Sequence, residues 1–291
     1  MSNETYRFNV GKFECIAISD GTMTYAPPNF PPPASFLFSN APKTAIQKIL
    51  PKYGIKPEQW NDWTSQYTCL VIKTEKNKVL IDTGAGSLMP TTGRLIKNLN
   101  HVGIMPEDID TVIITHGHPD HLGGNSDDYG NINFPKARWV MWKDEWEFWT
   151  SNRAENILDE HSKDLLVSIA RKNLSIIQDR VDLIDTESEI VPGIKAIATP
   201  GHTPGHMAVE VSSNRENLFC LSDVVLHPIH MEMPEWYAAV DIATDQLIST
   251  RKTLLRKAAG EKVKVIAFHF PFPGLGYVEA KGKTWQWRQI V

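Results

Sequence analysis

Apolar residues in this chain fall into short runs separated by polar turns. Strand-like runs occur at 13–21, 66–84 (a hairpin around 73–78), 111–115, 138–142, 194–199, 206–212, 217–221 and 263–268. Helical spacing occurs at 90–102, 143–150, 154–171 and 244–259. The strands come in pairs or runs with single helices between them, unlike the strict alternation of a doubly wound sheet. We therefore predict one α/β domain over residues 1–291, with two mixed sheets packed together and helices outside.

Residues 26–38, APPNFPPPASFLF, interrupt this pattern. The density of prolines argues against both a helix and a place in a strand ladder. The aromatic residues Phe30, Phe36 and Phe38 need something apolar to cover, which is unusual for a linker. We expect this segment to be a lid loop over an apolar pocket.

The overall composition excludes several classes of partner. The net charge of −4 and the pI near 6.2 do not favour binding to nucleic acid or to an anionic membrane. The three cysteines are far apart, which predicts a reducing compartment and no disulfide framework. No apolar run reaches the ~20 residues of a membrane span, and the polar start lacks a signal-peptide core. We expect a cytoplasmic protein.

The densest chemistry follows the run at 111–115, where the string HGHPDH occupies residues 116–121. In an extended chain, His116 and His118 point to the same side because they are two residues apart. Pro119 suits the first turn of a helix, which would carry Asp120 and His121. Imidazole and carboxylate groups are ligands of Zn²⁺, Mn²⁺ or Fe²⁺. A lone His-x-His would more often be a histidine-rich surface loop, but the full string is far more specific and predicts a metal site.

Three more donors follow strand-like runs downstream. They are His202 after 194–199, Asp223 after 217–221 and His269 directly after 263–268. A single histidine after a strand is more often a hydrogen-bonded structural residue. Together with the HGHPDH string, however, they predict a site along one edge of the two sheets.

These residues, with the Asp82-Thr83-Gly84 turn, give the chain a clear resemblance to the metallo-β-lactamase superfamily from about residue 67 onward. The resemblance implies a four-layer αβ/βα sandwich with two metals at its edge. It assigns His116, His118 and His202 to one metal, Asp120, His121 and His269 to the other, and Asp223 to a bridge between them. Asp82 would orient the ligand loop, as an outer carboxylate does.

Such a site implies two divalent metal ions per chain, with Zn²⁺ as the first choice and Mn²⁺, Fe²⁺ or Co²⁺ as alternatives. Metal ions can lower the pKa of bound water from ~15.7 to near 7. We therefore expect a metal-bridging hydroxide to add to a carbonyl or phosphoryl centre. Asp120 would act as a catalytic residue by orienting the hydroxide or accepting its proton.

The C-terminal part, with FPFPG after His269, resembles the branch that contains methyl parathion hydrolase and the quorum-quenching lactonases. Many of those lactonases carry a tyrosine three positions after the bridging aspartate, and here that position is Leu226. His227 is therefore our candidate for the leaving-group acid, with His230 as a second. A structural loop histidine is the alternative for each.

We predict a hydrolase acting on lactones or small aryl or acyl esters. An organophosphate triesterase and a non-catalytic, metal-binding regulatory protein are the alternatives. The expected partner is a small ester or lactone with an apolar portion; a homodimer is compatible with the sequence. Trp142, Trp146 and Trp149 share one helical face, which favours a core stripe over a substrate wall. His206 opens a strand-like run, which favours a structural role.

Overall fold

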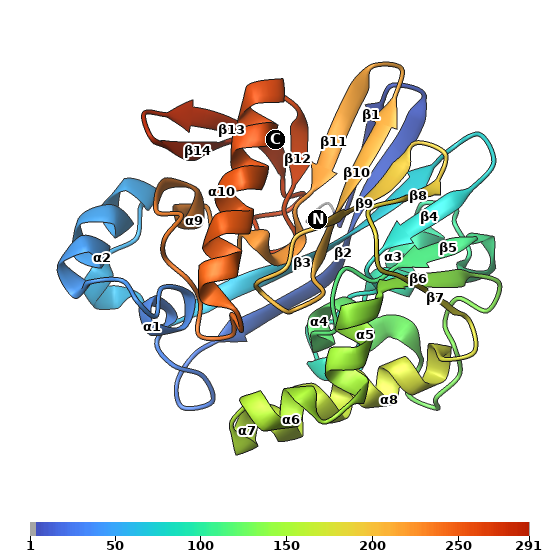
Figure 1. The fold of residues 1–291 in the computed structure, drawn as a ribbon, viewed down its shortest axis with the longest axis horizontal. Coiled ribbons are helices and arrows are strands. Elements are labelled where there is room, and N and C mark those ends of the chain that lie inside the picture. Colours follow the sequence, from blue (N-terminus) through green and yellow to red (C-terminus); the bar gives the residue numbers. More distant parts are fainter. Residues whose placement is uncertain (1–3, 291) are drawn as a thin grey trace.

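The computed structural model describes residues 4–290, and two seven-stranded sheets form its centre (Figure 1). The first sheet contains, in spatial order, β1 (Thr5–Val10), β2 (Phe13–Tyr25), β3 (Trp63–Lys73), β4 (Lys78–Ile81), β5 (Thr111–Ile113), β6 (Arg138–Trp142) and β7 (Val181–Ile184). The second contains β14 (Thr284–Gln289), β13 (Leu275–Lys281), β12 (Lys264–Ile266), β11 (Glu216–Cys220), β10 (Met207–Ser213), β9 (Ile194–Ala198) and β8 (Glu189–Val191).

Both sheets are mixed. In the first, β1 to β4 pair antiparallel and β4 to β7 pair parallel. In the second, β11 and β12 are the parallel pair and the other neighbours are antiparallel. Parallel strands end at the same edge of a sheet. The loops after β5, β9, β11 and β12 carry the candidate metal ligands.

The central strands are buried on both faces, which produces the layered arrangement. Along β2, Cys15 and Ala17 face the second sheet, whereas Ile16 and Ile18 face the outer helices, and all four are fully buried. One apolar cluster fills the space between the sheets. A second cluster lies between the first sheet and its helices, and a third lies between the second sheet and α10. This arrangement is the predicted four-layer sandwich.

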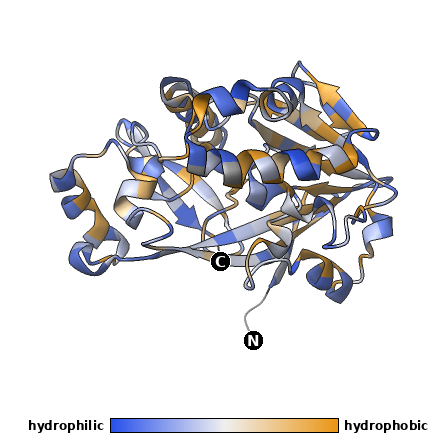
Figure 2. Cartoon of the chain, turned by 90° about the horizontal axis from the view of Figure 1, so that it is seen from below, coloured by the Kyte–Doolittle hydropathy of each residue, from blue (hydrophilic) through white to orange (hydrophobic). Residues whose placement is uncertain are grey.

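Helices cover both outer faces. They are α3 (Leu95–His101), α4 (Pro119–Leu122), α5 (Lys143–Thr150), α6 (Arg153–Ile157), α7 (Glu160–Ser162) and α8 (Ser168–Ile177) on the first sheet's side, and α10 (Thr244–Glu261) against the second. In Figure 2 these helices carry both hydrophobic and hydrophilic residues, as amphipathic covers of a sheet do. Within residues 4–290, no helix is long and apolar enough to cross a membrane.

Several predicted elements have different boundaries. The helix expected at 90–102 begins at Leu95, after a turn in which Gly93 has positive φ. The helix expected at 154–171 is divided, because α6 ends at Ile157 and a π-helical turn, Lys163–Val167, separates α7 from α8. A π-turn inserts an extra residue into the helix and often lies beside a functional site.

The prediction that prolines exclude a helix from residues 26–38 was wrong. Helix α1 (Pro33–Leu37) begins with Pro33, where the missing N–H costs nothing because first-turn N–H groups have no helical acceptor. With α2 (Lys43–Ile49) and α9 (Ile229–Glu232), it encloses a separate apolar cluster that includes Phe36, Phe38 and Trp236. This N-terminal helical segment lies beside α9 and α10 in Figure 1.

Candidate metal centre

The seven predicted donor side chains meet at one edge of the two sheets. His116 and His118 follow β5, and Asp120 and His121 lie on α4, whose first residue is Pro119. His202 lies between β9 and β10, Asp223 in the 3₁₀ turn Ser222–Val224 after β11, and His269 after β12. Their donor atoms form two groups, each within 4.8 Å. We call His116, His118, His202 and Asp223 the first donor group, and Asp120, His121 and His269 the second donor group.

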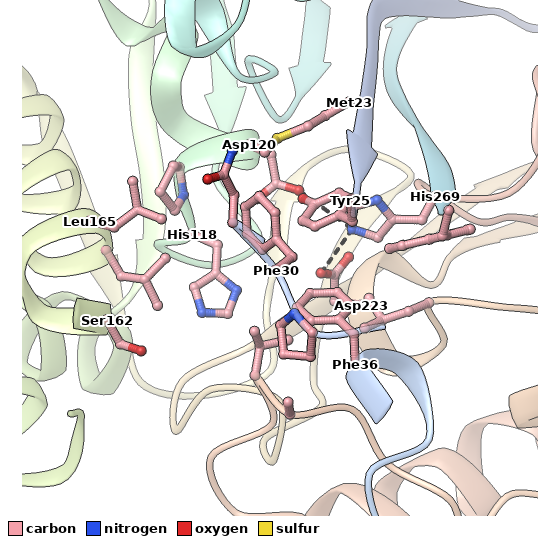
Figure 3. Close-up of a pocket in the computed structure, with 18 of the residues that line it drawn as sticks. Met23, Tyr25, Phe30, Phe36, His118, Asp120, Ser162, Leu165, Asp223 and His269 are labelled. Atoms are coloured by element: carbon pink, nitrogen blue, oxygen red, sulfur yellow. Dashed lines mark hydrogen bonds and ion pairs between the residues drawn. The ribbon is translucent and has the colours of Figure 1, made fainter. Parts of the chain in front are cut away.

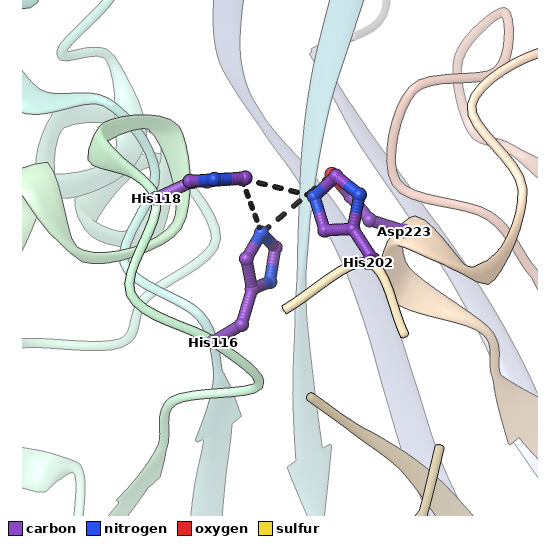
Figure 4. Close-up of side chains that lie close together, drawn as sticks. All are labelled: His116, His118, His202 and Asp223. Carbon is purple, nitrogen blue, oxygen red and sulfur yellow. Dashed lines mark hydrogen bonds and ion pairs between the residues drawn. The ribbon is translucent and has the colours of Figure 1, made fainter. Parts of the chain in front are cut away.

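In the first donor group, three ring nitrogens converge on one point (Figure 4). His118 Nδ1 lies 3.1 Å from His116 Nε2 and 2.9 Å from His202 Nε2. A tetrahedral zinc ion with Zn–N bonds of ~2.0–2.1 Å would hold neighbouring nitrogens roughly 3.3 Å apart. The spacing therefore fits three imidazole ligands of one ion.

Asp223 connects the two donor groups. Its Oδ2 lies 3.2 Å from His202 Nε2 and 3.1 Å from His269 Nε2, and its Oδ1 lies 3.3 Å from His121 Nε2. In the second donor group, Asp120 Oδ2 is 3.6 Å from His269 Nε2 and 3.8 Å from His121 Nε2. A carboxylate that lies close to histidines of both groups is suited to bridge two cations.

The environment of two of the donor histidines also fits metal ions. Burial lowers the pKa of His116 and His118 well below the usual value, so both are neutral and have a lone pair to offer. Within the two donor groups, three buried polar atoms have no hydrogen-bond partner among the described residues: His118 Nε2, His121 Nε2 and Asp223 Oδ1. Buried polar atoms without partners are costly, which indicates that part of this site is completed by a ligand.

Asp82 fixes the HGHPDH loop through hydrogen bonds to Thr115 and His121. Its carboxylate accepts hydrogen bonds from the Thr115 N–H at 2.8 Å, from the Thr115 hydroxyl at 2.9 Å and from His121 Nδ1 at 2.8 Å. The bond to Nδ1 leaves Nε2 of His121 facing Asp120 and Asp223. An outer carboxylate of this kind fixes the orientation of a ligand imidazole and raises its basicity.

Two further carboxylates support the site and were not found from the sequence. Asp241 accepts a hydrogen bond from Nδ1 of His202 at 2.5 Å. Burial would lower the pKa of His202, but Asp223 and Asp241 outweigh it and raise the pKa to about 9. Glu145 is fully buried and links the His118 loop to the His202 loop through Gly117 and Thr203. Neither residue belongs to a local motif, so the sequence held no signal for them.

A cavity of about 320 Å³ opens above the donors (Figure 3). His118, Asp120, His202, Asp223 and His269 form its polar floor. Its walls are mainly apolar: Met23, Tyr25, Phe30, Phe36 and Trp63 on one side, Leu165 and Leu166 of the π-helical turn on another, and Leu226 and Val240. The segment predicted as a lid thus contributes Phe30 and Phe36 to this wall, whereas Phe38 packs against Trp60 and Trp236.

The structure does not bring His227 to the cavity, so we do not assign it the role of leaving-group acid. Its ring packs against Phe38, Tyr53 and Trp60, and burial lowers its pKa to about 3. Leu226, the preceding residue, faces the cavity instead. The chain turns into α9 immediately afterwards, which directs His227 to the N-terminal helical segment.

The remaining candidate residues, two histidines and three tryptophans, have structural contacts and do not line the cavity. His230 contacts the carbonyl oxygen of Leu37 through Nε2 at 2.9 Å. His206 lies outside both donor groups and accepts a hydrogen bond from the Asp223 N–H at Nε2, at 3.1 Å. The tryptophans at 142, 146 and 149 belong to or pack against apolar clusters and are not among the residues that line the cavity. Packing in the core agrees with the preferred interpretation, but the single helical face does not, because Trp142 ends β6 and packs between the sheets.

Comparison with known proteins gives the same fold and family. The structure is similar to that of AidC, a dizinc quorum-quenching lactonase solved with the product N-hexanoyl-L-homoserine (TM-score 0.88, 24% identity, 99% of this chain and 97% of that one). It is also similar to the hydrolase AbOPH of the β-lactamase superfamily (TM-score 0.88, 28% identity, 100% and 99%). In sequence, an N-acyl homoserine lactonase from Bacillus sp is 29% identical over 167 residues, or 50% of this chain and 58% of that protein.

A second N-acyl homoserine lactonase, from Bacillus cereus, is 26% identical over 174 residues, covering 53% of this chain and 61% of the relative. The chain thus matches less than two thirds of the length of these curated relatives. The family model of the metallo-beta-lactamase superfamily matches residues 63–269, which include every member of both donor groups. The chain therefore belongs to the metallo-β-lactamase superfamily.

Proposed function

We propose that this protein is a two-metal hydrolase that opens lactones and cleaves small esters with an apolar acyl or aryl portion. The observation that carries the proposal is that members of both donor groups line one largely apolar cavity. The polar floor is suited to the ester group, and the aromatic and leucine walls are suited to its apolar portion. The similarity to N-acyl homoserine lactonases supports a lactone as the substrate class.

In this proposal, Zn²⁺ is the preferred ion. His116, His118 and His202 would hold one ion, Asp120, His121 and His269 would hold the other, and Asp223, which contacts both groups, would be shared. Two bound divalent cations supply a water of lowered pKa and positive charge at the site where the substrate oxygen becomes anionic.

The protein's own groups provide orientation and a proton acceptor. Asp120 is the least buried carboxylate of the site, with 13% of its side chain exposed, and it faces the cavity. It is therefore placed to orient the attacking water and take up its proton. Asp82 and Asp241 fix the two histidines that they contact. The apolar walls exclude bulk water, which strengthens each electrostatic interaction at the floor.

A phosphotriester with an aryl leaving group is the second candidate class. The observation that favours it is the group of stacked and edge-on rings formed by Tyr25, Phe30, Phe36 and Trp63, whose centroids lie 4.7 to 6.1 Å apart. Such a wall accommodates a flat aromatic leaving group as well as an acyl chain.

The test is a substrate panel on metal-analysed protein: an N-acyl homoserine lactone, an unsubstituted γ-lactone, a nitrophenyl ester and a phosphotriester. We expect lactone opening with release of one acid per ring, and His118→Ala should abolish it. His101→Ala is the matched control, because His101 is exposed at the end of α3. Turnover of the phosphotriester alone would move the function to the second class. No turnover of any substrate by fully metallated protein would leave a metal-binding, non-catalytic protein.

A further inference from the structure

A pair of tyrosine hydroxyls lies beside the donor groups and takes no part in the site described above. Tyr25, at the end of β2, lines the cavity, and Tyr67, on β3, lies behind it with no exposed surface. Their hydroxyl oxygens are 2.8 Å apart. The Tyr67 ring also contacts His269, with centroids 5.7 Å apart. Figure 3 shows Tyr25 beside His269 and Asp120.

The direction of this hydrogen bond follows from burial. Each hydroxyl has one proton, so one tyrosine donates to the other and the acceptor keeps a proton for a further partner. If Tyr67 were the acceptor, its own proton would need a second acceptor, and the described residues provide none for it. An unsatisfied buried donor is costly, whereas Tyr25 faces a cavity that admits water or substrate. We therefore infer that Tyr67 donates to Tyr25, which leaves the Tyr25 proton available to a group in the cavity that Tyr25 lines.

The hydrogen bond from Tyr67 and the neighbouring rings make Tyr25 a well-placed donor. A hydroxyl that accepts a hydrogen bond is polarised and donates a stronger one. The ring is held in place by stacking against Phe36 and Trp63 at 5.0 and 5.2 Å. Tyr25 is thus a fixed donor at the wall of a cavity whose floor is formed by candidate metal ligands.

We propose that Tyr25 donates a hydrogen bond to an oxygen of the substrate's ester group, and that Tyr67 is a positioning residue that orients and polarises the Tyr25 hydroxyl. The inference rests on the proposed function for the identity of the ligand. It assigns the donor to β2 of the first sheet and not to the turn before α9 that carries Leu226.

The kinetic test compares Tyr25→Phe and Tyr67→Phe at equal metal content. Losing a donor to a developing oxyanion typically lowers kcat by ~10²–10³-fold, so Tyr25→Phe should lower kcat on a lactone by about 10²-fold. Tyr67→Phe leaves the Tyr25 proton in place and should cost only about 3- to 10-fold, because only the polarisation and orientation are lost. Tyr53→Phe is the matched control, because the Tyr53 hydroxyl bonds to Glu232 at 2.7 Å and Tyr53 does not line the cavity.

A binding measurement separates this inference from the proposed function. The γ-lactam counterpart of an N-acyl homoserine lactone resists hydrolysis but presents the same carbonyl. Calorimetry should show binding weakened about 3- to 10-fold by Tyr25→Phe, as for loss of one neutral hydrogen bond. If the wild type binds the lactam in this way but hydrolyses nothing, the proposed function fails and the role of Tyr25 stands. Equal binding by wild type and Tyr25→Phe, or a larger kinetic loss in Tyr67→Phe than in Tyr25→Phe, overturns it.

Discussion

Replacing Glu145 by alanine should disconnect the two loops that carry His118 and His202. The carboxylate accepts four hydrogen bonds: at Oε1 from the Gly117 N–H (2.8 Å) and Trp149 Nε1 (2.6 Å), and at Oε2 from the Thr203 hydroxyl (2.6 Å) and the Gly205 N–H (2.9 Å). Burial raises the pKa of Glu145, which means that burying its charge costs free energy. Alanine removes this cost, which offsets part of the stability lost with the hydrogen bonds. Four orphaned donors at the low end of ~1–3 kcal/mol each give a destabilisation of about 4 kcal/mol.

Glutamine at the same position should cost less. Its carbonyl oxygen can replace Oε1, and the Thr203 hydroxyl can rotate to accept from the new amide. Only the Gly205 N–H then lacks an acceptor, which predicts a loss of about 1–3 kcal/mol. Domains of this kind have ~5–15 kcal/mol of stability in total, so both losses are measurable.

The assay is urea unfolding of metal-stripped protein, because bound metal would itself add stability to the folded state. Chelator competition on the same variants should show a larger loss of affinity for the ion of the first donor group than for the ion of the second. Glu147→Gln is the control, since Glu147 is exposed on the same helix. A Glu145→Ala variant within about 1 kcal/mol of the wild type, or equal losses for alanine and glutamine, would refute the reasoning.

Three further predictions concern other parts of the molecule. Asp241→Ala frees the imidazole of His202 and should weaken metal binding ~10–100-fold, measured by chelator competition; unchanged affinity would show that Asp241 has no orienting role. His227 stays neutral in the fold while the unfolded chain takes up a proton below pH ~6.5, so its contribution to stability falls as the pH drops from about 6.5 to about 3. His227→Gln should therefore flatten the wild-type slope of unfolding free energy by up to ~1.4 kcal/mol per pH unit in that range, and an identical slope would contradict a buried neutral histidine. Trimming Phe30 and Phe36 together to alanine should raise KM more for long-chain than for short-chain substrates, and equal effects would place both rings outside the substrate path.

The donor groups could be found from the sequence because their positions are set locally. The HGHPDH string follows a strand and opens a helix, so the chain geometry alone directs several donors to one edge. His202, Asp223 and His269 could be added because each lies in or next to a loop that follows a strand-like run, and such loops meet at one edge. The two-sheet architecture was predictable for the same reason, since strand-like and helical periods are visible in short windows.

The supporting residues could not be found because their partners are distant along the chain. Asp241 contacts a histidine 39 positions away, and Glu145 contacts Thr203 at a separation of 58. In the sequence, Glu145 looks like a solvent-facing acid among Lys143, Asp144 and Glu147. His227 illustrates the opposite error: it is close to Asp223 in sequence, but the chain turns between them and directs the two side chains to different sites.

The most direct test of a two-metal hydrolase measures metal content and lactone opening on one preparation. Chelator-stripped protein is titrated with Zn²⁺ while bound metal and the rate of acid release from an N-acyl homoserine lactone are followed together. We predict that binding saturates at two ions per chain, that turnover appears as the sites fill, and that Asp223→Ala impairs both ions. Saturation at one ion or none with the fold intact, or equal turnover by the stripped protein, would contradict the account.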